Sequence, residues 1–128
     1  MPKDGNKKTN CSRKKHCGLN CAQAVLCTYA DIAGIDEETA IRLAAPFGAG
    51  MGNMEGTCGA IVGAGLALGL ANKGASTRQM RQIMNRFQER SGATQCKLLK
   101  GVGTGKVLRE CTDCVADAAE FLEEQLNK

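Results

Sequence analysis

Aromatic residues are scarce in this chain of 128 residues, which has no tryptophan, one tyrosine and three phenylalanines. The core must therefore be built from Leu, Ile, Val, Met and Ala, a composition that suits helices packed closely through small side chains. Little in the sequence favours β-strands. We expect an all-α fold, a compact bundle of five to six helices.

Histidine is almost absent, since the only one is His16. Haem and mixed Cys–His zinc sites usually require histidine ligands, so the sequence argues against both.

A long apolar run is also missing. The longest apolar stretch, Gly59 to Ala71, is shorter than the ~20 residues that span a bilayer, and it fits a buried core helix. We expect no membrane insertion.

The first sixteen residues, "MPKDGNKKTNCSRKKH", are polar and basic and contain no apolar segment typical of a secretory signal. This predicts a cytoplasmic protein, in a compartment that keeps thiols reduced. The net charge of +4 is a property of this segment, because residues 1–16 carry +5 and the remaining chain −1. We expect residues 1–16 to be a disordered basic leader and residues 17–128 to form a single helical four-cysteine domain.

No aromatic residues alternate with the basic ones to stack on bases, so we expect no nucleic-acid partner. An interaction module whose leader binds an anionic partner is an alternative interpretation.

Helix starts and stops can be placed from capping residues. Asn20 and Gln23 form a capping box that opens a helix ending at Gly34, and Ser76 and Gln79 form another. A second helix follows Asp36 and ends near Pro46. The predicted helices cover about residues 20–34, 37–46, 57–74, 76–92 and 112–125, with a short helical turn within 93–101 and a glycine-dense connection over 48–57.

Eight cysteines are more than a domain of this size needs as disulfide staples. Four of them lie at predicted helix N-termini, namely Cys21, Cys58, Cys96 and Cys111. The unpaired N–H groups and the helix dipole stabilise a thiolate there, the form that acts as nucleophile and as metal ligand. Four thiolates brought together need a metal, an iron–sulfur cluster or pairing as disulfides to offset their repulsion. Buried cysteines that act only as small hydrophobes are the simpler alternative.

The other cysteines are less clearly placed. Cys111 and Cys114 form a C-x-x-C at the head of the last helix, but the chain lacks the βαβ setting of thioredoxins. Val115 stands where a c-type haem motif needs histidine, which excludes covalent haem c. Cys17, Cys27 and Cys114 are candidate auxiliary thiols, and Cys11 lies in the leader.

The segments "NCAQAVL", "AIRLAAPFGAGMGNMEGTCGAIVGAGLALGL", "FQERSGATQCKLL" and the late "REC" resemble the C-GCAxxG-C-C family of redox-active proteins over about residues 17–126. The four cysteines of that pattern fall on Cys21, Cys58, Cys96 and Cys111, and the supporting motif is completed by Gly59, Ala60 and Gly63. Thr57 replaces the glycine that precedes the second cysteine in the family name. The resemblance implies redox activity in a domain similar to part of the split-Soret cytochromes, where a non-haem iron–sulfur site accompanies the haems.

We therefore expect a redox protein in which the four pattern cysteines form one electron-transfer centre with an unidentified redox partner. The centre is either an Fe–S cluster, which ligands from four separate segments favour, or a set of reversible disulfides. A structural zinc site made of the four cysteines, without redox role, is the alternative. The glycines from 48 to 69 fit two interpretations, close backbone approach to this site and tight helix packing.

Overall fold

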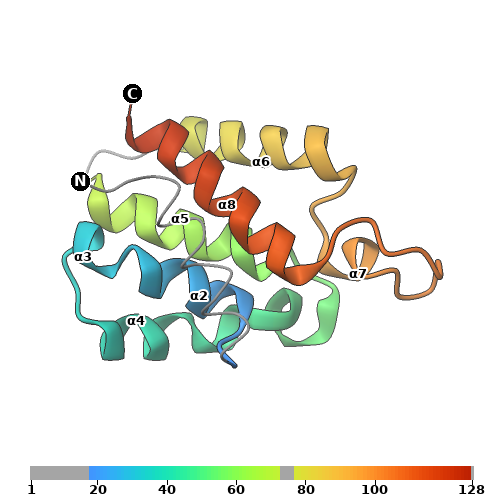
Figure 1. Cartoon of the computed structure of the whole chain (residues 1–128), viewed down its shortest axis with the longest axis horizontal. Helices are drawn as coiled ribbons and strands as arrows, with labels where there is room; N and C mark the ends of the chain where they lie inside the picture. The colour runs from blue at the N-terminus through green and yellow to red at the C-terminus, as the bar shows by residue number, and fades with distance from the viewer. Residues whose placement is uncertain (1–17, 73–76, 128) are drawn as a thin grey trace.

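Seven α-helices and no β-strand are found in residues 18–72 and 77–127, the part of the chain that this computed structural model describes (Figure 1). The predicted all-α fold is confirmed. The helices are α2 (Cys21–Thr28), α3 (Ala30–Ala33), α4 (Glu37–Ala44), α5 (Gly59–Ala71), α6 (Thr77–Ser91), α7 (Cys96–Leu99) and α8 (Cys111–Leu126). The expected leader and the predicted cap Ser76 lie outside the described residues.

Helix α5 is the centre of the bundle. It packs against α2 and α8, while α4 covers α2 and α6 covers α8. Its apolar and small residues lie on all sides, as in helices buried within a core. Figure 1 shows that α2, α5 and α8 all begin at the same end of the bundle, next to the short α7. Their N-terminal turns, each the positive end of a helix dipole, are thereby brought together.

The first predicted helix begins where its capping box places it. The Asn20 side-chain oxygen accepts a hydrogen bond from the Gln23 N–H at 2.8 Å, and Gln23 Oε1 accepts one from the Asn20 N–H at 2.9 Å. The prediction of one helix up to Gly34 was wrong in one detail. The chain turns at Tyr29, whose buried hydroxyl donates to the Ala119 carbonyl of α8 at 3.3 Å, so the segment is divided into α2 and α3.

The second predicted helix is α4, capped by Asp36, which accepts a hydrogen bond from the Thr39 N–H. It ends at Ala44 and continues as a 3-10 turn that contains Pro46. The third was predicted to begin near Thr57 but begins at Gly59, with Cys58 as its N-cap. Thr57 is instead held in an isolated antiparallel bridge with Gln95, which fixes its backbone in an extended conformation.

Helix α8 is anchored by a buried carboxylate. Asp117 is 2% exposed and accepts hydrogen bonds from Arg109 at 2.8 Å and 3.1 Å and from Arg90 of α6 at 3.0 Å. The Arg90 guanidinium also lies 4.8 Å from the centre of the Phe121 ring. These contacts attach α6 to α8 and fix the chain that leads into the first turn of α8.

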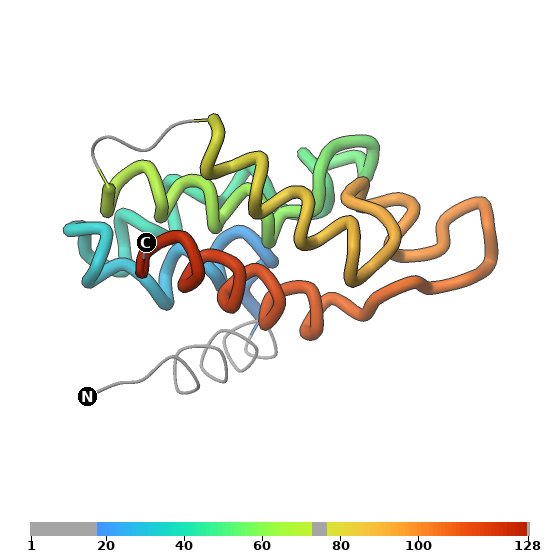
Figure 2. Tube along the Cα trace, turned by 90° about the horizontal axis from the view of Figure 1, so that it is seen from above, coloured from blue at the N-terminus to red at the C-terminus, as the bar shows by residue number. Residues whose placement is uncertain are grey.

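The segment between α7 and α8 forms a loop that extends from the end of the bundle at which α8 begins, coloured orange in both views (Figure 2). None of the described helices has the length and apolar character needed to cross a membrane.

Candidate redox site

One cavity of about 250 Å³ is lined by all four pattern cysteines, Cys21, Cys58, Cys96 and Cys111. Asn20, Ala49, Met54, Gly59 and Lys100 complete its lining. The four cysteines come from four segments that are distant in sequence. They meet because the helices that carry them begin at one end of the bundle, so the structure brings together the set that the sequence singled out.

Each pattern cysteine sits at the start of a helix. Cys21, Cys96 and Cys111 are the first residues of α2, α7 and α8, and Cys58 is the N-cap of α5. The cap of α7 is Gln95, within the predicted helical turn, and the cap of α8 is Glu110, so that α8 begins at Cys111 rather than at the predicted residue 112. These shifts are small and leave all four thiols on helix N-terminal turns.

Two backbone hydrogen bonds hold the segments before α5 and α7 side by side. The Cys58 N–H donates to the Thr94 carbonyl at 2.8 Å, and the Cys96 N–H donates to the Gly56 carbonyl at 3.0 Å. They flank the bridge between Thr57 and Gln95. The relative position of the Cys58 and Cys96 backbones is therefore fixed by main-chain contacts.

The glycine-dense connection forms a wall of the cavity in a left-handed conformation. Ala49, Met51 and Met54 have φ values of +52°, +68° and +65°, a region that costs a residue with a side chain about 1 kcal/mol or more. A Cβ on Gly50 would lie 2.5 Å from Cys96 Cβ, so only glycine allows this approach to the site. For Gly50, the structure supports close approach to the candidate site.

The supporting motif around Cys58 has a packing role. Gly59, Ala60 and Gly63 are buried on α5, and a Cβ on Gly63 would lie 2.7 Å from the Ala22 carbonyl oxygen of α2. A Cβ on Gly59 would lie 2.9 Å from the Phe47 carbonyl oxygen. These glycines let α5 approach α2 closely, which holds the cysteines that begin the two helices near one cavity.

The side chain of Cys114, a residue that the family pattern does not include, is the main influence on the pKa of Cys58. Hydrogen bonding with Cys114 lowers the pKa of Cys58 to about 7 and outweighs the opposing effect of burial. The positive charge of Lys100 and the N–H groups of Ala60 and Ile61 in the first turn of α5 lower the pKa of Cys58 further. The same contact, together with burial, raises the pKa of Cys114.

Cys21 and Cys111 form a second thiol pair at the cavity. The hydrogen bond between them and the burial of Cys21 raise the pKa of Cys21, so this thiol stays protonated. Burial raises the pKa of Cys96 as well. The four cysteines therefore have different local environments: that of Cys58 favours the thiolate, whereas those of Cys21, Cys96 and Cys114 favour the protonated thiol.

Lys100 is a site residue that sequence reasoning missed. Its Nζ lies 4.0 Å from Cys114 Sγ, and the residue lines the cavity with the four pattern cysteines. Burial alone would lower the pKa of Lys100, but the electrostatic interaction with the neighbouring cysteines, of which Cys58 is the one favoured as a thiolate, raises it. Its spacing of four residues from Cys96 places both on one helical face, a signal that could have identified it.

The candidate auxiliary thiols have different outcomes. Cys114 is fully buried and contacts Cys58, whereas Cys27 is buried in the core of the bundle and does not line the cavity. Cys17 and Cys11 lie outside the described residues.

A preformed site for a single metal ion is absent from the described residues, in which no three or more His, Cys, Asp or Glu side chains are gathered around one point. Zinc takes four ligands at about 2.0–2.3 Å, so the four-cysteine zinc site has no matching geometry here. The donor type and number around the cavity still suit an iron–sulfur cluster, which cysteine thiolates hold.

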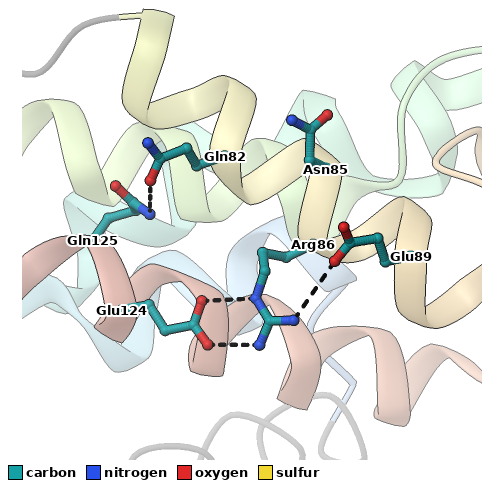
Figure 3. A pocket seen from close by; sticks show the side chains of 6 residues that line it. All are labelled: Gln82, Asn85, Arg86, Glu89, Glu124 and Gln125. Carbon is teal, nitrogen blue, oxygen red and sulfur yellow. Dashed lines mark hydrogen bonds and ion pairs between the residues drawn. The ribbon is translucent and has the colours of Figure 1, made fainter.

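A larger hollow of about 540 Å³ lies between α6 and α8 (Figure 3). It is lined by Gln82, Asn85, Arg86, Glu89, Glu124 and Gln125, and contains no cysteine. Arg86 is bound there by both carboxylate oxygens of Glu124, at 3.0 Å and 2.8 Å, and Gln125 donates to Gln82 at 2.9 Å. These contacts join the two helices. The cavity lined by the four cysteines is therefore the candidate redox site.

Comparison with known proteins agrees with the cysteine pattern. A family model described as "Putative redox-active protein (C_GCAxxG_C_C)" matches residues 19–125. No curated protein and no solved structure matches the chain. The match covers the described helical domain from the cap of α2 to the last turn of α8. The chain belongs to this C_GCAxxG_C_C family of redox-active proteins.

Proposed function

We propose that Cys21, Cys58, Cys96 and Cys111 form the redox centre of an electron-transfer protein that works by reversible disulfide formation. The observation that carries this proposal is that all four cysteines line one cavity, where the Cys111 side chain is the main influence on the pKa of Cys21. A disulfide requires two sulfurs that approach each other with little backbone movement. Membership of a redox-active family supports the same chemistry.

Oxidation of one such pair converts two thiols to a disulfide and releases two electrons and two protons. The electrons pass to an acceptor of the disulfide class, which is itself reduced to two thiols. The N–H groups of Ala60 and Ile61 in the first turn of α5 help to favour the thiolate of Cys58, from which this exchange starts. The fold contributes the fixed positions of the cysteines and the positive ends of α2, α5 and α8.

An iron–sulfur cluster on Cys21, Cys58, Cys96 and Cys111 is a second candidate. The observation that favours it is that four cysteines from four segments line one cavity, which provides the ligand number and type that such clusters use. When bound, a cluster supplies one-electron transfer without disulfide formation. The chain's own part would be to supply the thiolates and shield them from solvent.

The test is an anaerobic preparation examined by visible absorption and by iron, sulfide and zinc analysis, followed by thiol counting after mild oxidation. A metal-free protein that loses thiols in pairs, and regains them with a reductant, supports the disulfide proposal. Iron and sulfide with broad visible absorption would replace it with the cluster. A metal-free protein whose thiols do not react under native conditions would refute both. Cys27→Ala is the matched control, since Cys27 is a buried cysteine away from the cavity.

A further inference from the structure

We propose that Arg109, held by the buried carboxylate of Asp117, is the residue that positions Cys111 at the cysteine cavity. The inference rests on the proposed thiol–disulfide function and adds to it two residues outside the four-cysteine pattern. Arg109 is a positioning residue, because it acts on the centre through the backbone that leads into α8 and is not part of the cavity lining.

The side chain of Arg109 is fixed to α8 by two hydrogen bonds. Its Nε donates to Asp117 Oδ2 at 2.8 Å and its Nη2 donates to Oδ1 at 3.1 Å, the fork geometry in which a guanidinium recognises a carboxylate. Asp117 is 2% exposed, so water competes little for these bonds. Because Asp117 lies in the second turn of α8, the two bonds span the first turn, which carries Cys111.

The backbone of the same residue is joined to α7. The Leu99 carbonyl oxygen accepts hydrogen bonds from the N–H groups of Leu108 at 2.9 Å and Arg109 at 3.3 Å. Leu99 is the fully buried last residue of α7, the helix that begins at Cys96. Arg109 therefore connects the helix that begins with Cys96 to the helix that begins with Cys111.

The start of α8 lacks the constraint that a capping side chain usually supplies. Within residues 77–127 as the structure describes them, the N-cap Glu110 makes no side-chain capping hydrogen bond. Residues 102–108 before it are exposed, in the loop that extends from this end of the bundle (Figure 2). The contacts of Arg109 with Asp117 and Leu99 supply the missing constraint.

Asp117 also binds a second arginine, which provides a matched comparison. Arg90 of α6 donates to Asp117 Oδ1 at 3.0 Å and to the two carboxylate oxygens of Glu120 at 2.9 Å and 3.0 Å. Removal of either arginine takes a charged partner from the same buried carboxylate, so both changes should destabilise the fold. Only Arg109 is continuous with the chain that leads to Cys111.

Loss of the Arg109 contacts should let the first turn of α8 open locally. Opening exposes Cys111 to solvent and lowers its effective concentration relative to the other cavity cysteines. A disulfide made by Cys111 then becomes less stable than the two thiols, which raises the midpoint potential. We expect faster alkylation of Cys111 in the reduced protein and a higher midpoint potential.

The experiment compares wild type, Arg109→Gln and Arg90→Gln as reduced full-length chains under argon. Each is pulsed with iodoacetamide, and alkylation of every cysteine is quantified by mass spectrometry. Arg109→Gln should label Cys111 on the order of tenfold faster, as expected when a pair of charge-assisted hydrogen bonds is lost. Arg90→Gln should label Cys111 at the wild-type rate, and Cys27 in the core reports general unfolding in all three proteins.

A titration against mixtures of reduced and oxidised dithiothreitol gives the second readout. Arg109→Gln should raise the midpoint by about 30 mV for a tenfold loss in disulfide stability. Arg109→Lys, which keeps the charge and can donate to Asp117, should recover part of this shift. Arg90→Gln should leave the midpoint unchanged although it lowers stability towards urea.

Equal labelling of Cys111 in Arg109→Gln and wild type, or an equal increase in the two glutamine variants, would overturn the positioning role. A wild type that forms disulfides in the titration would still support the proposed function. Conversely, a wild type that forms none would refute that function, while the labelling of reduced thiols still tests Arg109.

Hydrogen exchange of the wild-type protein tests the constraint without any variant. The N–H groups of Leu108 and Arg109 donate to the buried Leu99 carbonyl, so they should exchange more slowly than those of the exposed loop residues Gly103 and Val107. Equal exchange at the four positions would show that the start of α8 is not held by α7, and would overturn the proposal.

Discussion

Raising the pH of the reduced, metal-free protein from about 7 to 9 should stabilise its fold. The pKa of the Cys58 thiol is lowered from its ordinary 9.0 to about 7, mainly by the hydrogen bond from Cys114. Because the folded value lies below the unfolded one, this contribution is fully present above pH 9 and is lost as the pH falls through 7. Two pKa units correspond to about 2–3 kcal/mol in the free energy of unfolding.

Above about pH 9 the trend should reverse. The pKa values of Cys21, Cys96 and Cys114 are raised, mainly by thiol contact or burial, so these thiols stay protonated in the folded protein when the unfolded chain begins to ionise. Their contribution is present below the unfolded pKa of 9.0 and declines as the pH rises above it. Each such thiol lowers stability by up to about 1.4 kcal/mol per pH unit in that range. The reduced protein should therefore be most stable between about pH 8 and 9.

The assay is urea unfolding followed by far-ultraviolet circular dichroism, performed with a phosphine reductant under argon at a series of pH values between about 6 and 10.5. Cys58→Ala is the control, because it removes the thiol responsible for the rise between pH 7 and 9. The wild-type protein should gain stability over this window and the variant should not. Parallel curves for the two proteins would refute the assigned environment of Cys58.

Three further predictions concern the scaffold. Gly63→Ala should lower the free energy of unfolding by about 2 kcal/mol, since its Cβ would lie 2.7 Å from the Ala22 carbonyl oxygen, whereas Gly69→Ala, in open space on the same helix, should be neutral or stabilising by up to about 1 kcal/mol in urea titrations. Asp117→Asn should cost about 2 kcal/mol by the same assay, because a buried carboxylate that binds two arginine side chains is lost. Cys27→Ala should leave the midpoint of a redox titration against dithiothreitol unchanged, since Cys27 does not line the cavity.

The helices could be predicted from the sequence because their start signals are local. Asn20 and Gln23 satisfy each other's backbone groups wherever the chain lies, so the start of α2 was found correctly. The N-cap of α5 was missed because Thr57 is the better capping residue by type. The bridge to Gln95, a contact between segments distant in the chain, fixes Thr57 in an extended conformation and leaves the cap position to Cys58.

The candidate site was predicted in part for a similar reason. Cys21, Cys58, Cys96 and Cys111 could be singled out, because a cysteine at a helix start is visible in the sequence. Which sulfur contacts which depends on how the helices pack, and that arrangement is set by buried contacts far apart in the chain. Lys100 was not predicted as a site residue, because lysine side chains are usually exposed. Only the folded structure shows that its ammonium group lies near cysteine sulfurs.

The first turn of α8 connects the redox proposal to the stability of the fold. It carries Cys111, which influences the pKa of Cys21 of α2, and Cys114, which influences the pKa of Cys58 of α5. A disulfide between α8 and either helix would close a long loop, and such a cross-link stabilises a folded domain by about 4 kcal/mol when its geometry is unstrained. This linkage is reciprocal. If a disulfide stabilises the fold, the fold stabilises that disulfide relative to the two thiols by the same free energy. If the proposed disulfides form, the packing of α2, α5 and α8 should make the reduced protein a better electron donor than an unfolded chain with the same cysteines.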